Sequence, residues 1–133
     1  MNRPDALNAL NIQVFKDLTA CLLAIAKNRE IRVVVIKGAG ERAFVAGADI
    51  KEMADIKGAM SSERSYLGMH VYDLLRHIPQ PVIASINGYA LGGGMLLAMA
   101  CDIRVAAEGA TFGYPEIKLG IFPGTGGTIL LDR

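Results

Sequence analysis

The sequence predicts an α/β fold on the basis of three observations. Apolar residues in the first part of the chain recur at three- and four-residue steps, the period of a helix with one buried face. Two short runs, "IRVVVIKG" and "PVIASIN", are rich in β-branched residues and hardly alternate with polar ones, which is typical of buried strands. These segments succeed one another as helix, strand, helix, strand, helix and strand, an order typical of layered α/β proteins.

The first helix is predicted over residues 12–27, with Asn11 as its N-cap. The run at residues 31–36 then predicts a strand covered on both faces, and "AGERAFVAGADIKEM" is expected to form a loop. One apolar stripe of the first helix comprises Ile12, Phe15, Leu18, Leu22 and Ile25.

A second helix is predicted over residues 61–77, ended by Pro79 and Pro81, and "PVIASIN" follows as the next strand. A third helix is expected over residues 94–100. The stretch "DIRVAAEGATFGYPEIKLGIFPGTGG" predicts short strands and turns, with Asp102 in a turn or capping role. "TILLDR" is expected to begin another helix. Since no strand opens the chain and no cap closes it, we expect residues 1–133 to be part of a larger domain.

Composition limits the class of protein. Hydrophobic residues make up 52% of the chain and charged residues 20%, so a sizeable core is expected. A formal net charge of +1 and scattered Lys and Arg argue against nucleic-acid and membrane-surface binding. No segment approaches the roughly 18 apolar residues of a membrane span. Cys21 and Cys101 are interpreted as two buried thiols in a reducing compartment, so a soluble intracellular protein is expected.

Two loops that follow buried strands carry the candidate chemistry. "AGADI" comes after the first strand and "ALGGGM" after the second, where the ends of parallel strands form a ligand crevice. The small residues Ala48 and Gly93 would let a ligand oxygen approach the main chain closely. If both loops face one crevice, their amides form an oxyanion hole, in which one donor is worth about a hundred- to a thousandfold in rate.

Glu116 in "FGYPEIKLG" is the candidate for proton transfer. Phe112, Tyr114, Ile117 and Leu119 surround it in sequence and are expected to desolvate its carboxylate partly. The alternative is a solvated turn residue after Pro115. "GTGGT" at residues 124–128 could bind an anion, but it lacks the G-x-G-x-x-G spacing of a dinucleotide site, which disfavours that reading.

Four motifs together resemble the crotonase (enoyl-CoA hydratase/isomerase) superfamily: "NRPDALNAL", "AFVAGADIKEM", "PVIASINGYALGGGMLLAMACDIRVAA" and "FGYPEIKLGIFPGTGGT". The resemblance covers nearly the whole chain. It implies a crotonase-like spiral of ββα units and identifies residues 1–133 as an N-terminal core domain. Members are usually about twice as long, so the first strand and the C-terminal helical part are expected to be missing.

The resemblance also implies roles for individual residues. The amides of Ala48 and Gly93 would hold the thioester carbonyl of an acyl-CoA. The loop of Ala48, Asp49, Ile50 and Lys51 would border the CoA, with Lys51 near its phosphates, and "NRPDAL" would run beside the nucleotide. CoA would arrive with the substrate, so no metal or redox cofactor is expected. A homo-oligomer, a trimer or dimer of trimers at full length, is implied, in the cytoplasm or alternatively in mitochondria or peroxisomes.

One departure from the family pattern bears on the reaction. Hydratases of the family carry two glutamates; the second matches Glu116, whereas the first position holds Leu96. Tyr114 stands where many hydratases have glutamine. Because leucine cannot move a proton, and a positioned acid–base group is worth about a hundred- to ten-thousandfold, isomerase-like chemistry with one carboxylate is favoured. The alternative is a CoA-thioester-binding homologue of low or no activity.

Overall fold

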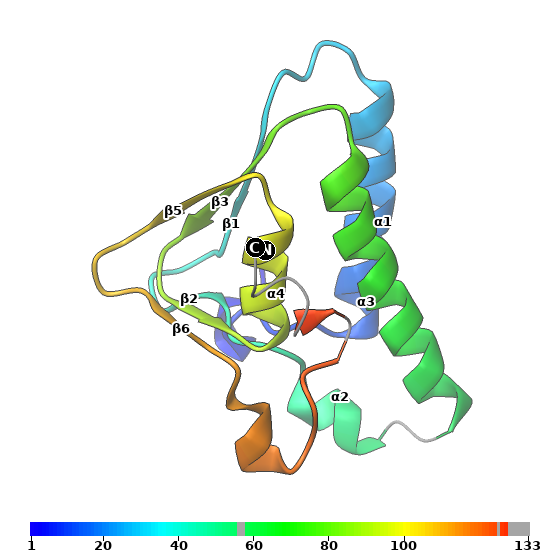
Figure 1. The fold of residues 1–133 in the computed structure, drawn as a ribbon, viewed down its shortest axis with the longest axis vertical. Helices are drawn as coiled ribbons and strands as arrows, with labels where there is room; N and C mark the ends of the chain where they lie inside the picture. The colour runs from blue at the N-terminus through cyan, green and yellow to red at the C-terminus, as the bar shows by residue number, and fades with distance from the viewer. Residues whose placement is uncertain (56–57, 125, 128–133) are drawn as a thin grey trace.

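The computed structural model describes residues 1–55, 58–124 and 126–127 (Figure 1). Two long helices, α1 (Ile12–Lys27) and α3 (Ala59–His77), lie side by side along one flank. The shorter helices are η1 (Pro4–Ala6), α2 (Ile50–Asp55), α4 (Gly93–Ala100) and η2 (Pro115–Leu119). The strands are β1 (Val34–Lys37), β2 (Ala43–Val45), β3 (Val82–Ile86), β4 (Tyr89–Leu91), β5 (Ile103–Ala106) and β6 (Thr111–Gly113).

The strands form two parallel sheets of three, in the orders β1-β3-β5 and β2-β4-β6. The chain therefore places one strand in the first sheet, the next in the second sheet, and then a helix, before it returns to the first sheet. This repeat is a spiral of ββα units, which confirms the predicted fold class. The expectation of a loop at "AGERAFVAGADIKEM" is wrong, because the segment contains β2 and the start of α2.

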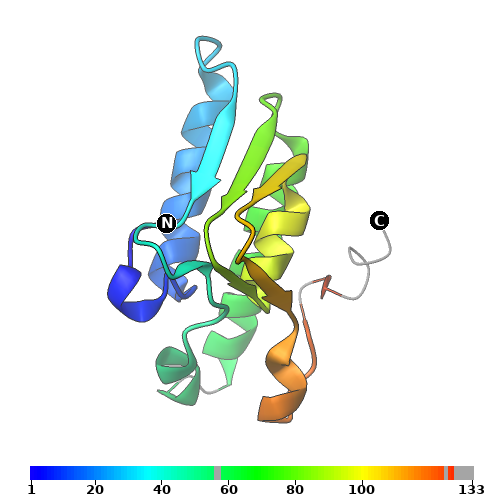
Figure 2. The same cartoon turned by 90° about the vertical axis from the view of Figure 1, so that its left-hand side faces the viewer.

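The helices gather on one face of the β1-β3-β5 sheet (Figure 2). Along β3 the residues alternate, with Val82, Ala84 and Ile86 buried and those between them half-buried. On the other face Val35 is 58% exposed and Val105 is 59% exposed. The prediction that the first strand is covered on both faces is therefore wrong within the described part of the chain.

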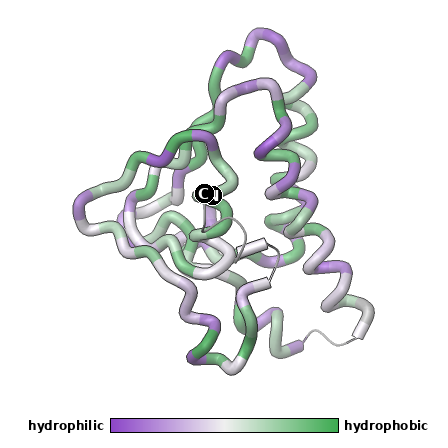
Figure 3. The backbone as a smooth tube through the Cα atoms, in the orientation of Figure 1, coloured by the Kyte–Doolittle hydropathy of each residue, from purple (hydrophilic) through white to green (hydrophobic). Residues whose placement is uncertain are grey.

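The core lies between the sheets and the two long helices, and α4 runs through it. Five of the eight residues of α4 are buried, and Figure 3 colours this helix hydrophobic, whereas the turn from α1 to β1 is largely hydrophilic. Cys101 is buried at the end of α4, and burial raises the pKa of its thiol to about 12. Cys21 is exposed, which corrects the prediction of two buried thiols. No helix in the described residues is both long and apolar enough to cross a membrane.

Local signals placed the helix ends well. Asn11 caps α1, because its side-chain oxygen accepts a hydrogen bond from the Val14 amide at 2.9 Å. Helix α3 ends at His77, just before Pro79, as the sequence predicts. Asp102 has a capping role at the start of β3, where its carboxylate accepts a hydrogen bond from the Val82 amide at 2.7 Å. The helix predicted at "TILLDR" falls on residues 128–133, outside the described residues.

Candidate active site

Three consecutive glycines open α4, and a Cβ at each would meet a different neighbour. Gly92 has φ +52°, a left-handed conformation that side chains rarely adopt, and a Cβ there would lie 2.5 Å from Oε1 of Glu116. A Cβ at Gly93 would press on the Leu10 side chain at 3.1 Å and on the Tyr72 hydroxyl at 3.2 Å. At Gly94 it would overlap the carbonyl oxygen of Val45 in β2. The glycines thus let α4 dock against β2 and leave room for a carboxylate at its N-terminus.

A cavity of about 240 Å³ opens at this N-terminus. Its walls come from the loop before α2, from α3, from the start of α4, and from the segment around η2. Five residues singled out from the sequence line it together: Ala48, Gly93, Leu96, Tyr114 and Glu116. The chain therefore brings the two candidate amide loops and the candidate carboxylate to one cavity.

The backbone amides of Ala48 and Gly93 both have no hydrogen-bond acceptor among the described residues. Beside Ala48, the parallel bridge to Leu10 uses the neighbouring groups instead, with the Asp49 amide donating to the Leu10 carbonyl at 2.9 Å. Gly93 is the first residue of α4, where helical geometry leaves amides unpaired and the helix dipole favours negative charge. Both amides can therefore donate to a ligand oxygen.

Glu116 lies in η2, directly after Pro115. Its Oε2 is buried and has no hydrogen-bond partner in the described part of the chain, and its Oε1 packs on Gly92. The neighbours expected to desolvate it behave otherwise: Ile117 is 82% exposed, and Phe112 and Leu119 are exposed as well. Burial of the carboxylate comes from its contact with the start of α4. An unpaired buried carboxylate oxygen can accept a proton or a hydrogen bond from a ligand.

Two tyrosines border the carboxylate. The Tyr114 hydroxyl donates to Sδ of Met99 at 3.5 Å, and burial, reinforced by Glu116, raises the pKa of Tyr114. The Tyr72 hydroxyl donates to the carbonyl of Gly93 at 3.1 Å, and burial raises the pKa of Tyr72 well above its ordinary value. Both phenols are therefore neutral at physiological pH and donate their protons to the groups named above.

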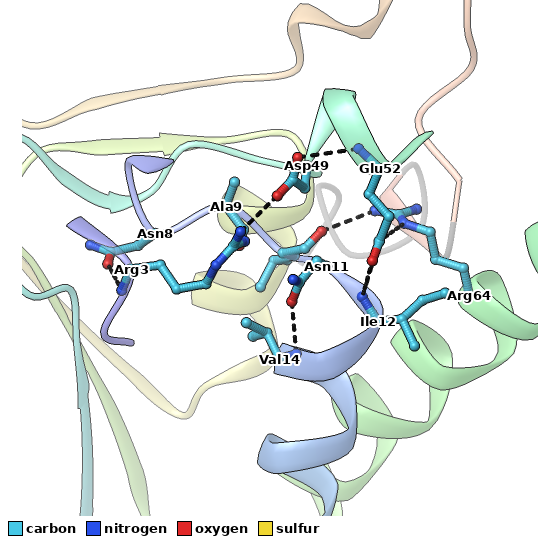
Figure 4. A network of polar contacts seen from close by, with 10 residues as sticks. Arg3, Asn8, Ala9, Asn11, Ile12, Val14, Asp49, Glu52 and Arg64 are labelled. Atoms are coloured by element: carbon cyan, nitrogen blue, oxygen red, sulfur yellow. Dashed lines mark hydrogen bonds and ion pairs between the residues drawn. The ribbon is translucent and has the colours of Figure 1, made fainter. Parts of the chain in front are cut away.

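Three predicted residues do not line the cavity. Asp49 forms an ion pair with Arg3 at 2.9 Å and accepts from the Glu52 amide at 3.4 Å (Figure 4). The hydrogen bond from Arg3 holds the pKa of Asp49 below its usual range. Ile50 is 59% exposed and Lys51 is exposed, both at the start of α2. Their role beside CoA stays a prediction.

Comparison with known proteins identifies the family. The sequence model of the enoyl-CoA hydratase/isomerase family matches residues 1–133. The chain belongs to this family. It is 47% identical to a short-chain-enoyl-CoA hydratase of Clostridium acetobutylicum and 44% identical to a crotonyl-CoA hydratase of Syntrophomonas wolfei, covering 100% of this chain and 51% of each relative.

Solved structures agree. An enoyl-CoA hydratase from Bacillus anthracis superposes with a TM-score of 0.96 at 43% identity, covering 99% of this chain and 51% of that one. The resemblance seen in the sequence is therefore confirmed. The chain spans about half the length of the curated relatives it matches.

Sequence reasoning missed the contribution of α3 to this site. Arg64, Gly68 and Tyr72 line the cavity and follow one another at four-residue steps, so they share one helix face. A glycine inside a predicted helix, flanked at that spacing by two large polar side chains, was the available signal. Within the described residues, no three metal-ligating side chains cluster together.

Proposed function

We propose that this member of the enoyl-CoA hydratase/isomerase family holds the thioester carbonyl of an acyl-CoA between the amides of Ala48 and Gly93. Glu116 then moves a proton between carbons of the acyl group. The observation that carries the proposal is a buried carboxylate oxygen without a partner, in the same cavity as two unpaired amides. CoA enters as part of the substrate, and the step needs only groups of the chain and the thioester.

The proposed reaction is a double-bond shift. In a 3-enoyl thioester, the Glu116 carboxylate takes a proton from C2, and the C–H electron pair moves toward the carbonyl to give a dienolate. The amides of Ala48 and Gly93 stabilise its oxyanion, each worth about a hundred- to a thousandfold in rate. The carboxyl group returns the proton to C4, which leaves a 2-enoyl thioester and restores the carboxylate.

Leu96 favours this reaction over hydration. It is 1% exposed and lines the cavity, so an alkyl group lies at the position of the first hydratase glutamate. Hydration that uses two carboxylates would lack the first of them in this chain, because position 96 holds leucine. Hydration is the second candidate, because the relatives from Clostridium acetobutylicum and Syntrophomonas wolfei carry hydratase names. A homo-oligomer of the whole protein remains a proposal that rests on the family resemblance.

Substitution of the carboxylate tests the proposal. We expect Glu116→Gln to lower isomerisation of a 3-enoyl-CoA by at least about a hundredfold, because the amide cannot take up the proton. Binding of the thioester, measured by calorimetry, should survive. The control is Glu108→Gln, which changes an exposed glutamate that does not line the cavity. Unchanged turnover in Glu116→Gln would remove Glu116 from its role.

The same measurements separate an enzyme from a binding homologue. A protein without turnover would gain thermal stability from an acyl-CoA and leave the acyl group unchanged. An enzyme would convert the acyl group, by a double-bond shift or by hydration followed by absorbance or NMR, and this conversion would disappear in Glu116→Gln. Thioester binding with no conversion in the parent protein would favour the binding homologue.

Leu96→Glu tests the choice between isomerisation and hydration. The substitution supplies a second carboxylate in the cavity, and we expect hydration of a crotonyl thioester to rise by about tenfold or more. Leu97→Glu, next in the helix and fully buried, is not a matched control because it would disrupt the core. Leu96→Gln is the matched control, because it adds a polar side chain at the same position without a base. Equal rates in both variants would contradict the assignment.

A further inference from the structure

The wall that α3 contributes to the cavity is polar. Ser61, Arg64 and Ser65 line the same cavity as the two unpaired amides and Glu116. A site for a purely hydrocarbon acyl chain needs no charge on its wall, and burying a charge is costly. The arginine therefore requires an explanation beyond the binding of the thioester carbonyl.

The protein itself engages Arg64 only loosely. Its Nη2 donates to the Leu10 carbonyl at 3.5 Å, and its Nε lies 3.9 Å from the Glu52 carboxylate (Figure 4). Both Glu52 oxygens also accept from the Ile12 amide, at 3.1 and 3.0 Å, so Arg64 shares this carboxylate with the main chain. The guanidinium carbon also lies 5.8 Å from the ring centroid of Phe15. These contacts hold the side chain in place and leave most of its donors available.

The terminal nitrogens of Arg64 carry its unused donors. The Nε is buried and lies toward the Glu52 carboxylate, so a ligand does not reach it, whereas Nη1 has no hydrogen-bond partner among the described residues. A guanidinium carries five N–H groups in a planar fork, and its strongest partner is a carboxylate that accepts two parallel hydrogen bonds. An anionic oxygen from a ligand would therefore satisfy a group that the fold leaves unpaired.

We propose that the acyl group of the substrate ends in a carboxylate and that Arg64 binds this carboxylate. The inference rests on the proposed function, which places the thioester carbonyl at Ala48 and Gly93. Because Arg64 lines the same cavity as those amides, its partner belongs to the acyl part of the thioester.

A matched pair of thioesters tests the proposal. Pent-2-enoyl-CoA and 4-carboxybut-2-enoyl-CoA differ only in a terminal methyl group or carboxylate. We expect the protein to bind the carboxylate thioester at least about tenfold more tightly in calorimetry, and to lose this preference in Arg64→Gln, as expected for a charged hydrogen bond. Arg64→Lys should retain part of it. Arg76→Gln, an exposed position on the same helix, is the control and should retain all of it.

The outcomes distinguish this inference from the proposed function. If Arg64→Gln weakens both thioesters equally, its partner is a CoA phosphate and the carboxylate proposal is overturned. Equal affinity of the parent protein for the two thioesters also overturns it, while the role of Glu116 stands on its own turnover assay. If carboxylate preference depends on Arg64 but turnover survives Glu116→Gln, the selectivity is supported and the proposed mechanism fails. Failure of both thioesters to bind overturns both proposals.

Discussion

The two sides of the cavity are built differently. The amides of Ala48 and Gly93 belong to segments fixed by the core, where Val45 and Leu97 are fully buried. Glu116 belongs to η2, whose next residue, Ile117, is 82% exposed. The amide side is therefore preorganised by packing, whereas the carboxylate side depends on a short helix at the surface and its contact with α4. Oxyanion stabilisation benefits most from such rigidity, because donors already in place need no reorganisation during the reaction.

The largest expected effect comes from a methyl group on the amide side. Gly94→Ala places a Cβ into the Val45 carbonyl, so α4 must move away from β2. We expect a loss of about 3 kcal/mol in the free energy of unfolding, measured with denaturant. Gly113→Ala, just before Tyr114, is the counterpart on the carboxylate side, because its Cβ would meet only the Leu91 side chain at 4.0 Å. A similar loss in both variants would contradict the difference between the two sides.

A smaller effect is expected at the hydrogen bond between α3 and the amide side. Tyr72→Phe removes the donor to the Gly93 carbonyl and keeps the ring that packs edge-on against Phe15. We expect a loss of about 1 kcal/mol in stability. Because Gly93 carries one oxyanion donor, we also expect a lower kcat for a 3-enoyl-CoA with little change in KM.

Tyr66→Phe is the control for this substitution, since Tyr66 lies on the same helix and is 71% exposed. It should leave both stability and kcat unchanged. Unaltered kcat in Tyr72→Phe, together with a normal loss of stability, would limit Tyr72 to a structural role.

The smallest effect concerns the ion pair of Asp49 with Arg3, beside Ala48. The pKa of Asp49 is lowered in the folded protein, chiefly by the hydrogen bond from Arg3, so this carboxylate stabilises the fold above its unfolded pKa. That contribution is lost as the pH falls below about 4. We expect Asp49→Asn to cost about 1 kcal/mol or less near neutral pH and to reduce the loss of stability on acidification.

Thermal unfolding of the parent protein and Asp49→Asn between pH 7 and pH 3 measures this difference, and Asp55→Asn at an exposed position of α2 is the control. A constant gap in melting temperature across the whole range would show that Asp49 does not titrate as described.

Local sequence signals were sufficient for part of this structure. The N-cap at Asn11 and the end of α3 before Pro79 depend on neighbouring residues alone. The strand β2 was missed because three residues, Ala43–Val45, are too few to show a period. The exposure of Cys21 and Ile117 depends on how distant segments pack against their helices, which local sequence patterns do not indicate.

The residues of the candidate site divide in the same way, into those that the local sequence indicates and those that become apparent only in the folded chain. Ala48, Gly93 and Glu116 could be proposed because glycine-bearing turns after strands and a positioned carboxylate have recognisable sequence patterns. The helical spacing of Arg64, Gly68 and Tyr72 indicated only a shared helix face. The significance of Arg64 arises from contacts with Leu10, 54 residues earlier in the chain, and with Glu52. A buried donor without a partner becomes visible only when distant segments are in place.

The contact between Gly92 and Glu116 has a consequence for how this site can change over evolution or in design. A Cβ at position 92 would press on the carboxylate of Glu116, so we expect the effects of substitutions at the two positions to be coupled. Shortening the acid at position 116 would relieve this clash but not the strain of a φ of +52°, which disfavours every residue other than glycine at position 92. Glycine at position 92 is therefore favoured twice over, by its own backbone conformation and by the acid that lies against it.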